Sequence, residues 1–226
     1  MGKLIIIEGG DGSGKATQTQ RLWQRLSEEG VHVQKVEFPN YSSPSSALVK
    51  MYLGGEFGTQ PDDVNPYSAS TFYAVDRYAS YKTLWGDFYN QGGVILSDRY
   101  TTSNMIHQAV KIKDHDRWED YIDWLKDFEY RLMGLPKPEV VIYLNMPPDF
   151  SIHFIANRED KSSVSNQDIH EKNLSYLRDS YQNAQKVKSR ENWVNIECMS
   201  GEQLKSIEEI HEEIYTIVKK VLSGLK

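Results

Sequence analysis

The stretch that most constrains the fold is IIIEGGDGSGKATQ at residues 5–18, where an apolar run leads through a glycine-rich turn into a segment with helical character. Gly9, Gly14 and Lys15 match a phosphate-binding loop of the form G-x-x-x-x-G-K-[ST], except that Ala16 stands at the hydroxyl position. Such a loop needs a strand before it and a helix after it, because backbone N–H groups and the helix N-terminus must face the anion together. The stretch therefore predicts an α/β chain with a phosphate site after its first strand. The alternative is an ordinary glycine-rich turn that carries a surface lysine.

Further apolar runs follow along the chain, with helical spacing between them. Five runs are short and rich in β-branched residues, as strands buried on both faces of a parallel sheet are, and they lie at residues 4–7, 31–36, 94–96, 140–144 and 193–196. Helical spacing follows at residues 22–26, which Gly30 closes, and at residues 204–221. We therefore expect one α/β domain over residues 1–226, with a doubly wound five-stranded parallel sheet flanked by helices. Ligands of such sheets bind beyond the carboxyl ends of the strands.

The residues of the glycine-rich turn have separate expected roles. Its glycines would let the backbone curl around a β-phosphate, and Lys15 would neutralise charge on the β- and γ-phosphates. Ala16 cannot bind Mg²⁺, and Thr17 is turned by about 100° on a helix, so it is no automatic replacement. Asp11 is the expected metal ligand or charge partner, because hard cations prefer carboxylate oxygens. The residues expected to contact a phosphate donor are Gly9, Gly10, Gly12, Ser13, Gly14, Lys15, Ala16 and Thr17.

A second charged motif follows the third strand. In VILSDRYTTSN, residues 94–104, the strand ends at Asp98 and Arg99, which places both charges at the predicted ligand edge. Arg99 would clamp a phosphoryl group during transfer, and Asp98 would hold the arginine or a metal-bound water. Acid–base pairs after strands are often plain surface salt bridges, and that alternative is equally open.

Aromatic residues near arginine form the third signal. VEFPNYSSPSS, residues 36–46, leaves the second strand and presents Tyr41. STFYAVDRYAS, residues 70–80, has a spacing that places Tyr73 and Arg77 on one face of a helix. A flat ring beside a guanidinium suits a base that is stacked and hydrogen-bonded at an exocyclic oxygen. The competing interpretation is a core aromatic, which is the commoner role at this spacing.

Two polar segments are too long for simple loops, at residues 40–58 and 157–168. Both look too polar for the core, so we expect them to be mobile pieces that cover a ligand. By contrast, a stripe with helical periodicity is expected in the core or at a dimer surface, and it consists of Trp118, Tyr121, Trp124, Leu125 and Phe128.

Bulk composition narrows the class of ligand. Hydrophobic residues make up 39% and charged residues 26% of the 226 residues, an ordinary globular balance. No stretch approaches the roughly 20 apolar residues of a membrane span, so we expect no membrane partner. A net charge of -6 argues against a broad nucleic-acid-binding face but permits a local pocket for a small anion. The single Cys198 and the absence of a signal segment indicate a cytoplasmic protein.

Taken in order, the segments GGDGSGKATQ, FPNY, FYAVDRY, SDRYTTSN and DIHEKN closely resemble the thymidylate kinase family of nucleoside monophosphate kinases, over residues 3 to about 220. The DRY segment, following FP-x-Y and F/Y-A-x-D-R, is far more specific than the phosphate loop. The resemblance implies a P-loop NTPase fold, transfer of the γ-phosphate of ATP to dTMP to give dTDP, dependence on Mg²⁺, and a homodimer.

The resemblance also implies roles for single residues. It places Lys15 on the donor phosphates and both Asp11 and Arg99 near the acceptor phosphate. It gives Tyr73 a stacking contact with thymine and gives Arg77 a hydrogen bond to a thymine carbonyl. The remaining residues of the implied acceptor site are Phe38 and Tyr41 beside the phosphate, together with Asp98, Asn104, His107 and His170.

Three departures from the family pattern accompany the resemblance. Ala16 replaces the usual hydroxyl residue, at a position that the resemblance implies is more variable here than in other P-loop enzymes. His107 falls where an aromatic often faces the acceptor sugar, and His170 stands where a tyrosine is common. Both histidines would alter sugar or base preference.

Residues 157–168 match the position of the lid that closes over ATP in the family. Arg158 is the expected catalytic cation of this lid, and Lys161 is the second candidate. A closing lid excludes the water that would otherwise hydrolyse ATP. The alternative is a charged but merely solvated loop.

Two other functions stay open on sequence alone. One is a P-loop kinase acting on another deoxynucleotide or on a nucleoside. The other is a nucleotide-binding module without catalysis, and Ala16 is the only feature of the sequence that supports it.

Overall fold

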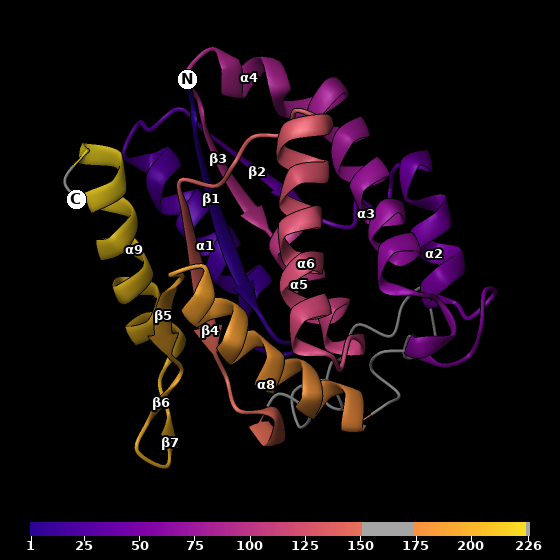
Figure 1. The fold of residues 1–226 in the computed structure, drawn as a ribbon. Coiled ribbons are helices and arrows are strands. Elements are labelled where there is room, and N and C mark those ends of the chain that lie inside the picture. The colour runs from indigo at the N-terminus through magenta and orange to yellow at the C-terminus, as the bar shows by residue number, and fades with distance from the viewer. Residues whose placement is uncertain (151–173, 225–226) are drawn as a thin grey trace.

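Five parallel strands form the central sheet, in the spatial order β2–β3–β1–β4–β5 (Figure 1). The computed structural model describes residues 1–150 and 174–224. The strands are β1 Lys3–Gly9, β2 Val33–Glu37, β3 Val94–Asp98, β4 Val140–Asn145 and β5 Val194–Glu197. The α/β class and the five-stranded parallel sheet are confirmed, and each strand lies within three residues of its predicted position.

The central strand β1 explains why its sequence is a continuous apolar run. Ile5 and Ile7 are buried on one face of the sheet, and Leu4 and Ile6 are buried on the other. Because side chains alternate along a strand, burial on both faces requires apolar residues at every position. The outer strands β2 and β5 are only partly buried, since each has a neighbouring strand on one side alone.

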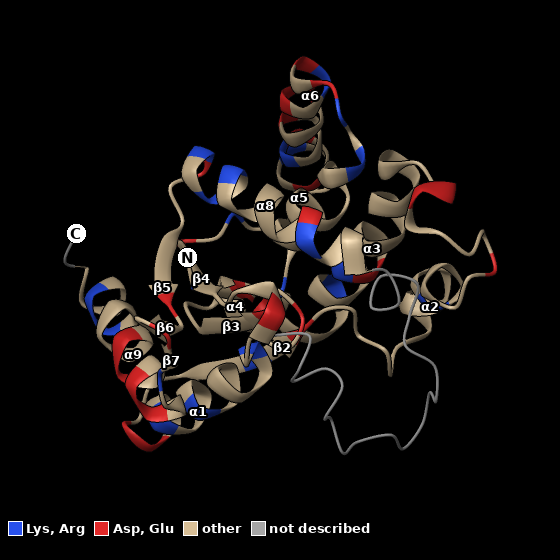
Figure 2. Cartoon of the chain, turned by 90° about the horizontal axis from the view of Figure 1, so that it is seen from below, with Lys and Arg blue, Asp and Glu red and all other residues tan. Residues whose placement is uncertain are grey.

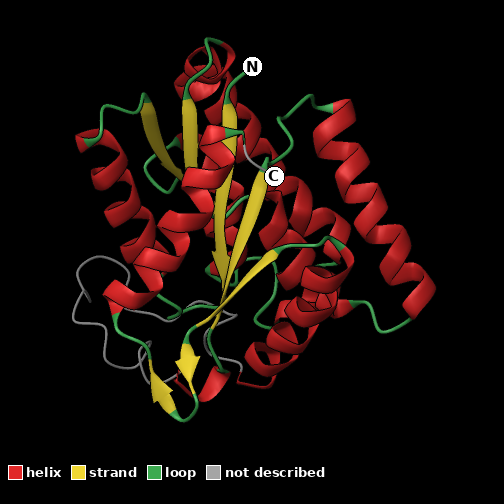
Figure 3. Ribbon diagram, turned by 90° about the vertical axis from the view of Figure 1, so that its left-hand side faces the viewer, coloured by secondary structure: helices red, strands yellow, loops and turns green. Residues whose placement is uncertain are grey.

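Two helices, α1 Lys15–Glu28 and α9 Ile207–Ser223, cover the face that carries Ile5 and Ile7. Leu22 and Leu26 of α1 pack there with Ile214 of α9. The predicted helix at 204–221 is wrong at its start, because Leu204 belongs to a small hairpin, β6 Met199–Ser200 and β7 Gln203–Leu204 (Figure 3). The helix begins only after Ser206, whose hydroxyl accepts a hydrogen bond from the Glu209 N–H.

The opposite face is covered by a thicker layer of helices (Figures 1 and 3). Its α-helices are α2 Ala47–Leu53, α3 Pro66–Ser80, α4 Gly86–Asn90, α5 Thr101–His107, α6 His115–Lys126 and α8 Leu174–Arg190. Two π-helical segments continue α3 and α6, namely η3 Tyr81–Trp85 and η5 Asp127–Leu132. Three short 3₁₀ turns complete the layer, η1 Pro44–Ser46, η2 Pro61–Asp63 and η4 Ala109–Lys111.

The aromatic stripe on α6 lies in the core, one of the two places predicted for it. Trp118, Tyr121 and Leu125 are buried against Met105 of α5. Trp124 is partly buried and stacks on Phe128 with ring centroids 5.3 Å apart. The stripe therefore anchors the helical layer that carries one wall of the site.

The segment 40–58 is packed more firmly than its composition predicted. Val49 and Tyr52 of α2 are fully buried beside Ala69 of α3. Lys111 donates to the Tyr52 hydroxyl over 2.9 Å and to the Val64 carbonyl over 2.9 Å. The expectation that this stretch is too polar for the core was wrong, because one apolar face of α2 packs against α3. The second segment, 157–168, lies outside the described residues.

Residues of both charge signs are interspersed along the helices (Figure 2). Between α1 and α9 they form ion pairs, with Arg25 donating to Glu212 over 2.5 Å and Arg21 paired with Glu208. Such exposed pairs contribute little to stability. Within residues 1–150 and 174–224, no helix has the length and apolar character needed to cross a membrane.

Candidate active site

The glycine-rich turn between β1 and α1 adopts the conformation of a phosphate-binding loop. Gly12 and Gly14 have φ values of 77° and 87°, in the left-handed region that glycine adopts without strain. Helix α1 begins at Lys15, so its free N–H groups face the inside of the loop. At Gly9 a side chain is excluded by space as well, because a Cβ atom there would lie 2.7 Å from Ser13 Oγ.

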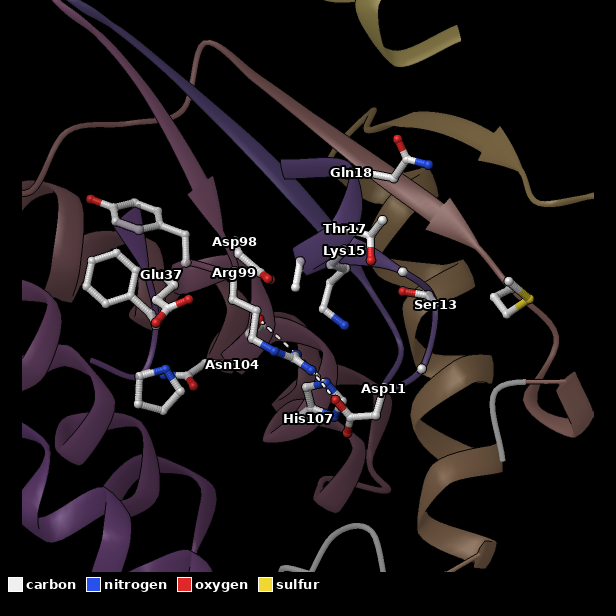
Figure 4. Close-up of a pocket in the computed structure, with 18 of the residues that line it drawn as sticks. Asp11, Ser13, Lys15, Thr17, Gln18, Glu37, Asp98, Arg99, Asn104 and His107 are labelled. Carbon is white, nitrogen blue, oxygen red and sulfur yellow. Dashed lines mark hydrogen bonds and ion pairs between the residues drawn. The ribbon is translucent and has the colours of Figure 1, made fainter. Parts of the chain in front are cut away.

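A cavity of about 760 Å³ opens above this loop, at the carboxyl ends of the strands. It brings together segments that are far apart in the sequence, from α1, α3, α5 and the ends of β2 and β3 (Figure 4). Of the residues predicted from sequence, those that line the cavity are Asp11, Gly12, Ser13, Gly14, Lys15, Ala16, Thr17, Phe38, Tyr41, Tyr73, Arg77, Asp98, Arg99, Asn104 and His107. Gly9 and Gly10 shape the turn beneath it.

Lys15 is the cation at the centre of the loop. Its side chain is buried, and its ammonium group donates to the Gly10 carbonyl over 2.7 Å. Burial and the nearby Arg99 guanidinium lower the pKa of Lys15 to about 8. An ammonium group held away from water in this way gains strongly from an anion bound beside it.

Arg99 reaches the same space from the end of β3. It forms an ion pair with Asp11 of the loop (Figure 4) and, over 3.8 Å, a second one with Glu8 of β1. Burial disfavours the charge, but the carboxylates of Asp11 and Glu8 outweigh it and hold the pKa of Arg99 above its ordinary value. Asp98 was predicted to hold either the arginine or a metal-bound water. Among the described residues, the ion pairs of Arg99 are formed by Asp11 and Glu8 instead of Asp98. The Arg99 backbone has a φ of 66°, a left-handed conformation that is uncommon for residues other than glycine. Such backbone conformations cluster at functional sites.

Glu8 is a site residue that the sequence analysis missed. Its carboxylate is fully buried and accepts hydrogen bonds from the hydroxyls of Thr102 over 2.7 Å and Ser103 over 2.8 Å. It also accepts from the Gly9 N–H over 3.0 Å. Glu8 thereby links β1, the loop and α5, and it positions Arg99 from below. The available signal was a carboxylate directly after the apolar run at residues 4–7.

His107 lies against Arg99 rather than standing alone at the cavity wall. Burial and the Arg99 guanidinium lower the pKa of His107 to about 3, so the ring is neutral at physiological pH. Arginine can only donate, so His107 Nε2, 3.3 Å from Arg99 Nη1, accepts, and the ring proton lies on Nδ1. A sugar hydroxyl that donated to Nε2 would have to displace Arg99.

The opposite part of the cavity is built by α3 and α5. Tyr73 and Arg77 come from successive turns of α3, and Asn104 comes from α5. The Asn104 amide donates to the Ser70 carbonyl over 3.4 Å, which ties the two helices together. Arg77 is buried, and Glu129 binds two of its three guanidinium nitrogens. A ring, a guanidinium and an amide thus converge on one side of the cavity.

Asp76 supports the loop that follows β2, and the sequence analysis missed this role. Its carboxylate accepts from the Asn40 N–H over 2.7 Å and from the Ser45 hydroxyl over 2.6 Å. These bonds hold the backbone beside Phe38 and Tyr41 against α3. Asp76 directly precedes Arg77, so the helix that carries the guanidinium also anchors the neighbouring wall.

The end of the cavity near α9 was not foreseen at all. It is lined by Gln18 of α1, by Leu204 and Lys205, and by the first turn of α9 with Ile207 and Ile210. Gln18 Nε2 donates to the Ile207 carbonyl over 2.9 Å, which fixes the start of α9 against α1. The hairpin of β6 and β7 brings these residues to the loop, and nothing local in the sequence indicates that packing.

The oxygen donors at the loop fit a cation such as Mg²⁺ whose shell is completed by phosphates and water. Asp11, Thr17 and Asp98 line the cavity, whereas Ala16 has no ligand to offer. The described part of the chain contains no group of three His, Cys, Asp or Glu residues that could hold a metal by itself. Mg²⁺ commonly binds through one or two carboxylates plus substrate phosphates, which this donor set allows. Asp11 would have to share its carboxylate between the cation and Arg99.

Three predicted residues cannot be placed relative to the cavity. Arg158, Lys161 and His170 lie outside residues 1–150 and 174–224. Their roles stay predictions.

Comparison with known proteins agrees with this geometry. The thymidylate kinase family profile matches residues 7–214. The thymidylate kinase of Plasmodium falciparum is 27% identical over 223 residues, which cover 97% of this chain and 91% of that protein. The thymidylate kinase of Mycobacterium tuberculosis is 32% identical over 142 residues, 62% of this chain and 64% of that one.

A solved structure matches the fold. The thymidylate kinase of Candida albicans superimposes with a TM-score of 0.71 at 23% sequence identity, covering 97% of this chain and 92% of that one. The P-loop arrangement of sheet, loop and first helix is therefore shared. Since the family profile covers nearly all of the sequence and its motifs line one cavity, this chain belongs to the thymidylate kinase family.

Proposed function

We propose that the protein transfers the γ-phosphate of ATP to dTMP, giving ADP and dTDP. The observation that carries the proposal is that one cavity contains both a phosphate loop and a base-sized site of Tyr73, Arg77 and Asn104. In Figure 4, Arg99 lies between Asn104 on one side and Lys15 on the other. Two phosphorylated ligands bound at the two ends would meet at Arg99, as in-line transfer requires.

The chain's own residues supply charge at the point of transfer. Lys15 would neutralise the β- and γ-phosphates of ATP, and Arg99 would bind the phosphoryl group between donor and acceptor. Both cations are already oriented by partners in the protein, the Gly10 carbonyl for Lys15 and the buried Glu8 carboxylate for Arg99. When bound beside Asp11, Mg²⁺ would neutralise further phosphate charge. Residues at the α9 end, such as Leu204 and Ile207, provide apolar surface for the donor base.

The acceptor end is expected to favour a pyrimidine with an oxo group. We expect dTMP to have the highest kcat/KM in a panel with dUMP, UMP, dCMP, dGMP and thymidine, because Arg77 donates where cytosine presents an amino group. A buried donor left unpaired costs roughly 1 to 3 kcal/mol, or about one to two decades of specificity. Coupled measurement of ADP release with each acceptor tests the proposal.

Arg77→Ala refines the same test. It should lower kcat/KM for dTMP far more than it raises the KM for ATP, since Arg77 lies at the acceptor end. A purine or cytosine nucleotide as the best acceptor would contradict the thymidylate assignment and leave a kinase of other specificity. Absence of ADP release with every acceptor would favour a binding module.

Magnesium dependence is predicted to involve Asp11. We expect Asp11→Asn to lower kcat by about 10- to 100-fold and to flatten its dependence on Mg²⁺ concentration, because the loop has no hydroxyl at Ala16 and loses its one carboxylate. Magnesium titrations of wild type and Asp11→Asn, with the exposed Asp116→Asn as control, provide the measurement. Wild-type turnover across the titration would mean that the cation is held elsewhere.

A pH effect is expected from Lys15. Its pKa of about 8 in the free protein means that the charged form is lost as the pH rises above that value. We therefore expect kcat/KM for ATP to fall above about pH 8, whereas kcat persists to higher pH because bound phosphates raise the pKa of Lys15. Burial also lowers the pKa of Lys111 to about 8, so Lys111→Gln is the control variant and should keep the same profile. A flat kcat/KM profile up to about pH 10 would contradict the role of Lys15.

Lys15 also links pH to stability. Between its folded pKa of about 8 and the ordinary value of 10.5, the unfolded chain binds more protons than the folded chain. The free energy of unfolding of the ligand-free protein should therefore rise with pH across that window, and below it the cost of burying the charged lysine is fully present. Lys15→Met should remove its share of this rise.

Assembly and location are part of the proposal as well. Exposed apolar side chains on and beside α3, at Val75, Tyr78 and Leu84, support a homodimer of this chain. Light scattering of the purified protein at several concentrations would test the dimer. The proposal also includes a single kinase domain over residues 1–226 and a lid at residues 157–168. It places the protein in the cytoplasm.

A further inference from the structure

A buried carboxylate behind the acceptor site has no part in the chemistry proposed above. Glu129 is fully buried and forms a two-point ion pair with Arg77, whose side chain is 2% exposed. Arg77 Nε donates to Glu129 Oε2 over 2.7 Å, and Nη2 donates to Oε1 over 2.6 Å. Two parallel bonds of this kind fix both the position and the plane of a guanidinium group.

The local helix geometry explains how Glu129 reaches Arg77. Glu129 lies in η5, the π-helical segment that continues α6. A π-helical turn contains more residues than an α-helical turn, so it changes the direction in which the following side chains point, and such turns are frequent at functional sites. The Glu129 carbonyl also accepts from the Leu135 N–H over 3.0 Å, which closes the end of the segment.

A third element locks the pair. The hydroxyl of Thr101, the first residue of α5, donates to Glu129 Oε2 over 2.7 Å. Helices α3 and α5 and segment η5 therefore meet at one carboxylate. Losing the carboxylate would leave a charged guanidinium buried without its partner, which is strongly unfavourable and would drive Arg77 to reorient.

The pair leaves one edge of Arg77 for a ligand. Glu129 accepts from Nε–H and from one N–H of Nη2, and Nη1 donates to the Tyr100 carbonyl over 3.4 Å. Arg77 lines the cavity together with Tyr73 and Asn104, so the second N–H groups of Nη1 and Nη2 are the donors that remain for a base bound there. A guanidinium nitrogen only donates, so it attracts an oxo oxygen and repels an amino group.

We propose that Glu129 is a positioning residue that sets the base selectivity of the acceptor site, by holding Arg77 so that one of its remaining N–H groups meets the 4-oxo oxygen of the pyrimidine. The inference rests on the proposed function, since it takes the acceptor to be a thymine nucleotide. Without Glu129 the guanidinium would rotate, and its N–H groups would no longer distinguish an oxo group from an amino group or from hydrogen.

The test compares two acceptors in two proteins. The acceptors are dTMP and its analogue with hydrogen in place of the 4-oxo group, and the proteins are wild type and Glu129→Gln. The glutamine keeps the shape, but its NH₂ group opposes one Arg77 N–H group. We expect wild type to favour dTMP by at least about tenfold in kcat/KM, and Glu129→Gln to reduce that preference to within about threefold. The KM for ATP should change by less than about twofold, because Arg77 lies at the proposed acceptor end of the cavity.

The matched control is Glu191→Gln, which makes the same substitution in an ion pair with Lys126, away from the cavity. It should leave the preference intact even if it lowers the melting temperature. Should Glu129→Gln fail to fold, Thr101→Val removes only the third bond on the carboxylate and should reduce the preference about threefold.

The outcomes separate the inference from the function beneath it. If wild type itself does not favour dTMP over the analogue, the base contact fails and with it that part of the proposed function. If wild type does favour dTMP and the folded Glu129→Gln variant favours it equally, Glu129 has only a structural role and the inference is overturned. If Glu129→Gln does not fold and Thr101→Val is used in its place, an unchanged preference for dTMP in Thr101→Val also overturns the inference.

Discussion

Replacing Lys15 by alanine is expected to lower kcat by roughly 10²- to 10³-fold while the fold is retained. Lys15 is the buried cation of the phosphate loop, and its ammonium group is held by the Gly10 carbonyl. Charge shifts toward the bridge between the β- and γ-phosphates in the transition state, so a cation fixed there stabilises that state more than the bound substrates. The loss should therefore appear in kcat rather than in the KM for dTMP.

The measurement is steady-state ADP release, with circular dichroism and thermal unfolding to establish that the variant is folded. Lys35 is an exposed lysine on β2, and within the described residues its side chain hydrogen-bonds only to Gln20. Lys35→Ala is therefore a suitable control. A folded Lys15→Ala variant with near-normal turnover would remove Lys15 from the mechanism.

The second large effect is expected at Arg99. We expect Arg99→Met to lower kcat on the order of 10³-fold, because this guanidinium lies between the phosphate loop and the acceptor end and would neutralise the phosphoryl group in transfer. Glu8→Gln should have a smaller effect, about tenfold, because it keeps Arg99 and weakens only its positioning. The order of these two losses is the informative result.

Single-turnover measurements with both nucleotides bound would separate chemistry from product release. Arg131→Met is the matched control, since Arg131 is an exposed arginine that pairs, within the described residues, with Asp127. If Arg99→Met kept more than about a tenth of wild-type kcat, phosphoryl charge would have to be neutralised by other groups, and the short contact between Arg99 and Asp11 would be structural.

Asp11 connects these two effects to the metal. Its carboxylate pairs with Arg99, yet it is also the loop's one carboxylate for a cation. A cation that drew Asp11 away would leave Arg99 with Glu8 and with the phosphates. If the proposed metal role of Asp11 holds, its carboxylate would compensate for Ala16 and could serve either partner, which an ordinary hydroxyl at that position cannot do.

The sequence alone determined the sheet, the glycine-rich loop and the edge of the sheet at which the cavity lies. These follow from local rules, because continuous apolar runs mark strands buried on both faces and a glycine-rich turn before a helix marks an anion site. The same rules placed Asp98 and Arg99 beside the loop, since parallel strands end at one edge. They also identified Tyr73 and Arg77 as neighbours, because four residues span about one helical turn.

Only the tertiary structure decided which partner each of those residues has. Glu8 beneath Arg99, Asp76 beneath the loop after β2 and Glu129 behind Arg77 are joined to their partners by contacts between distant segments. No period in the sequence reports them, because a carboxylate within a helical or apolar pattern looks the same whether it faces water or a buried cation. A π-helical turn at η5 further breaks the regular spacing on which such a prediction depends. Burial and charge pairing in three dimensions, not local pattern, therefore set the chemistry of this site.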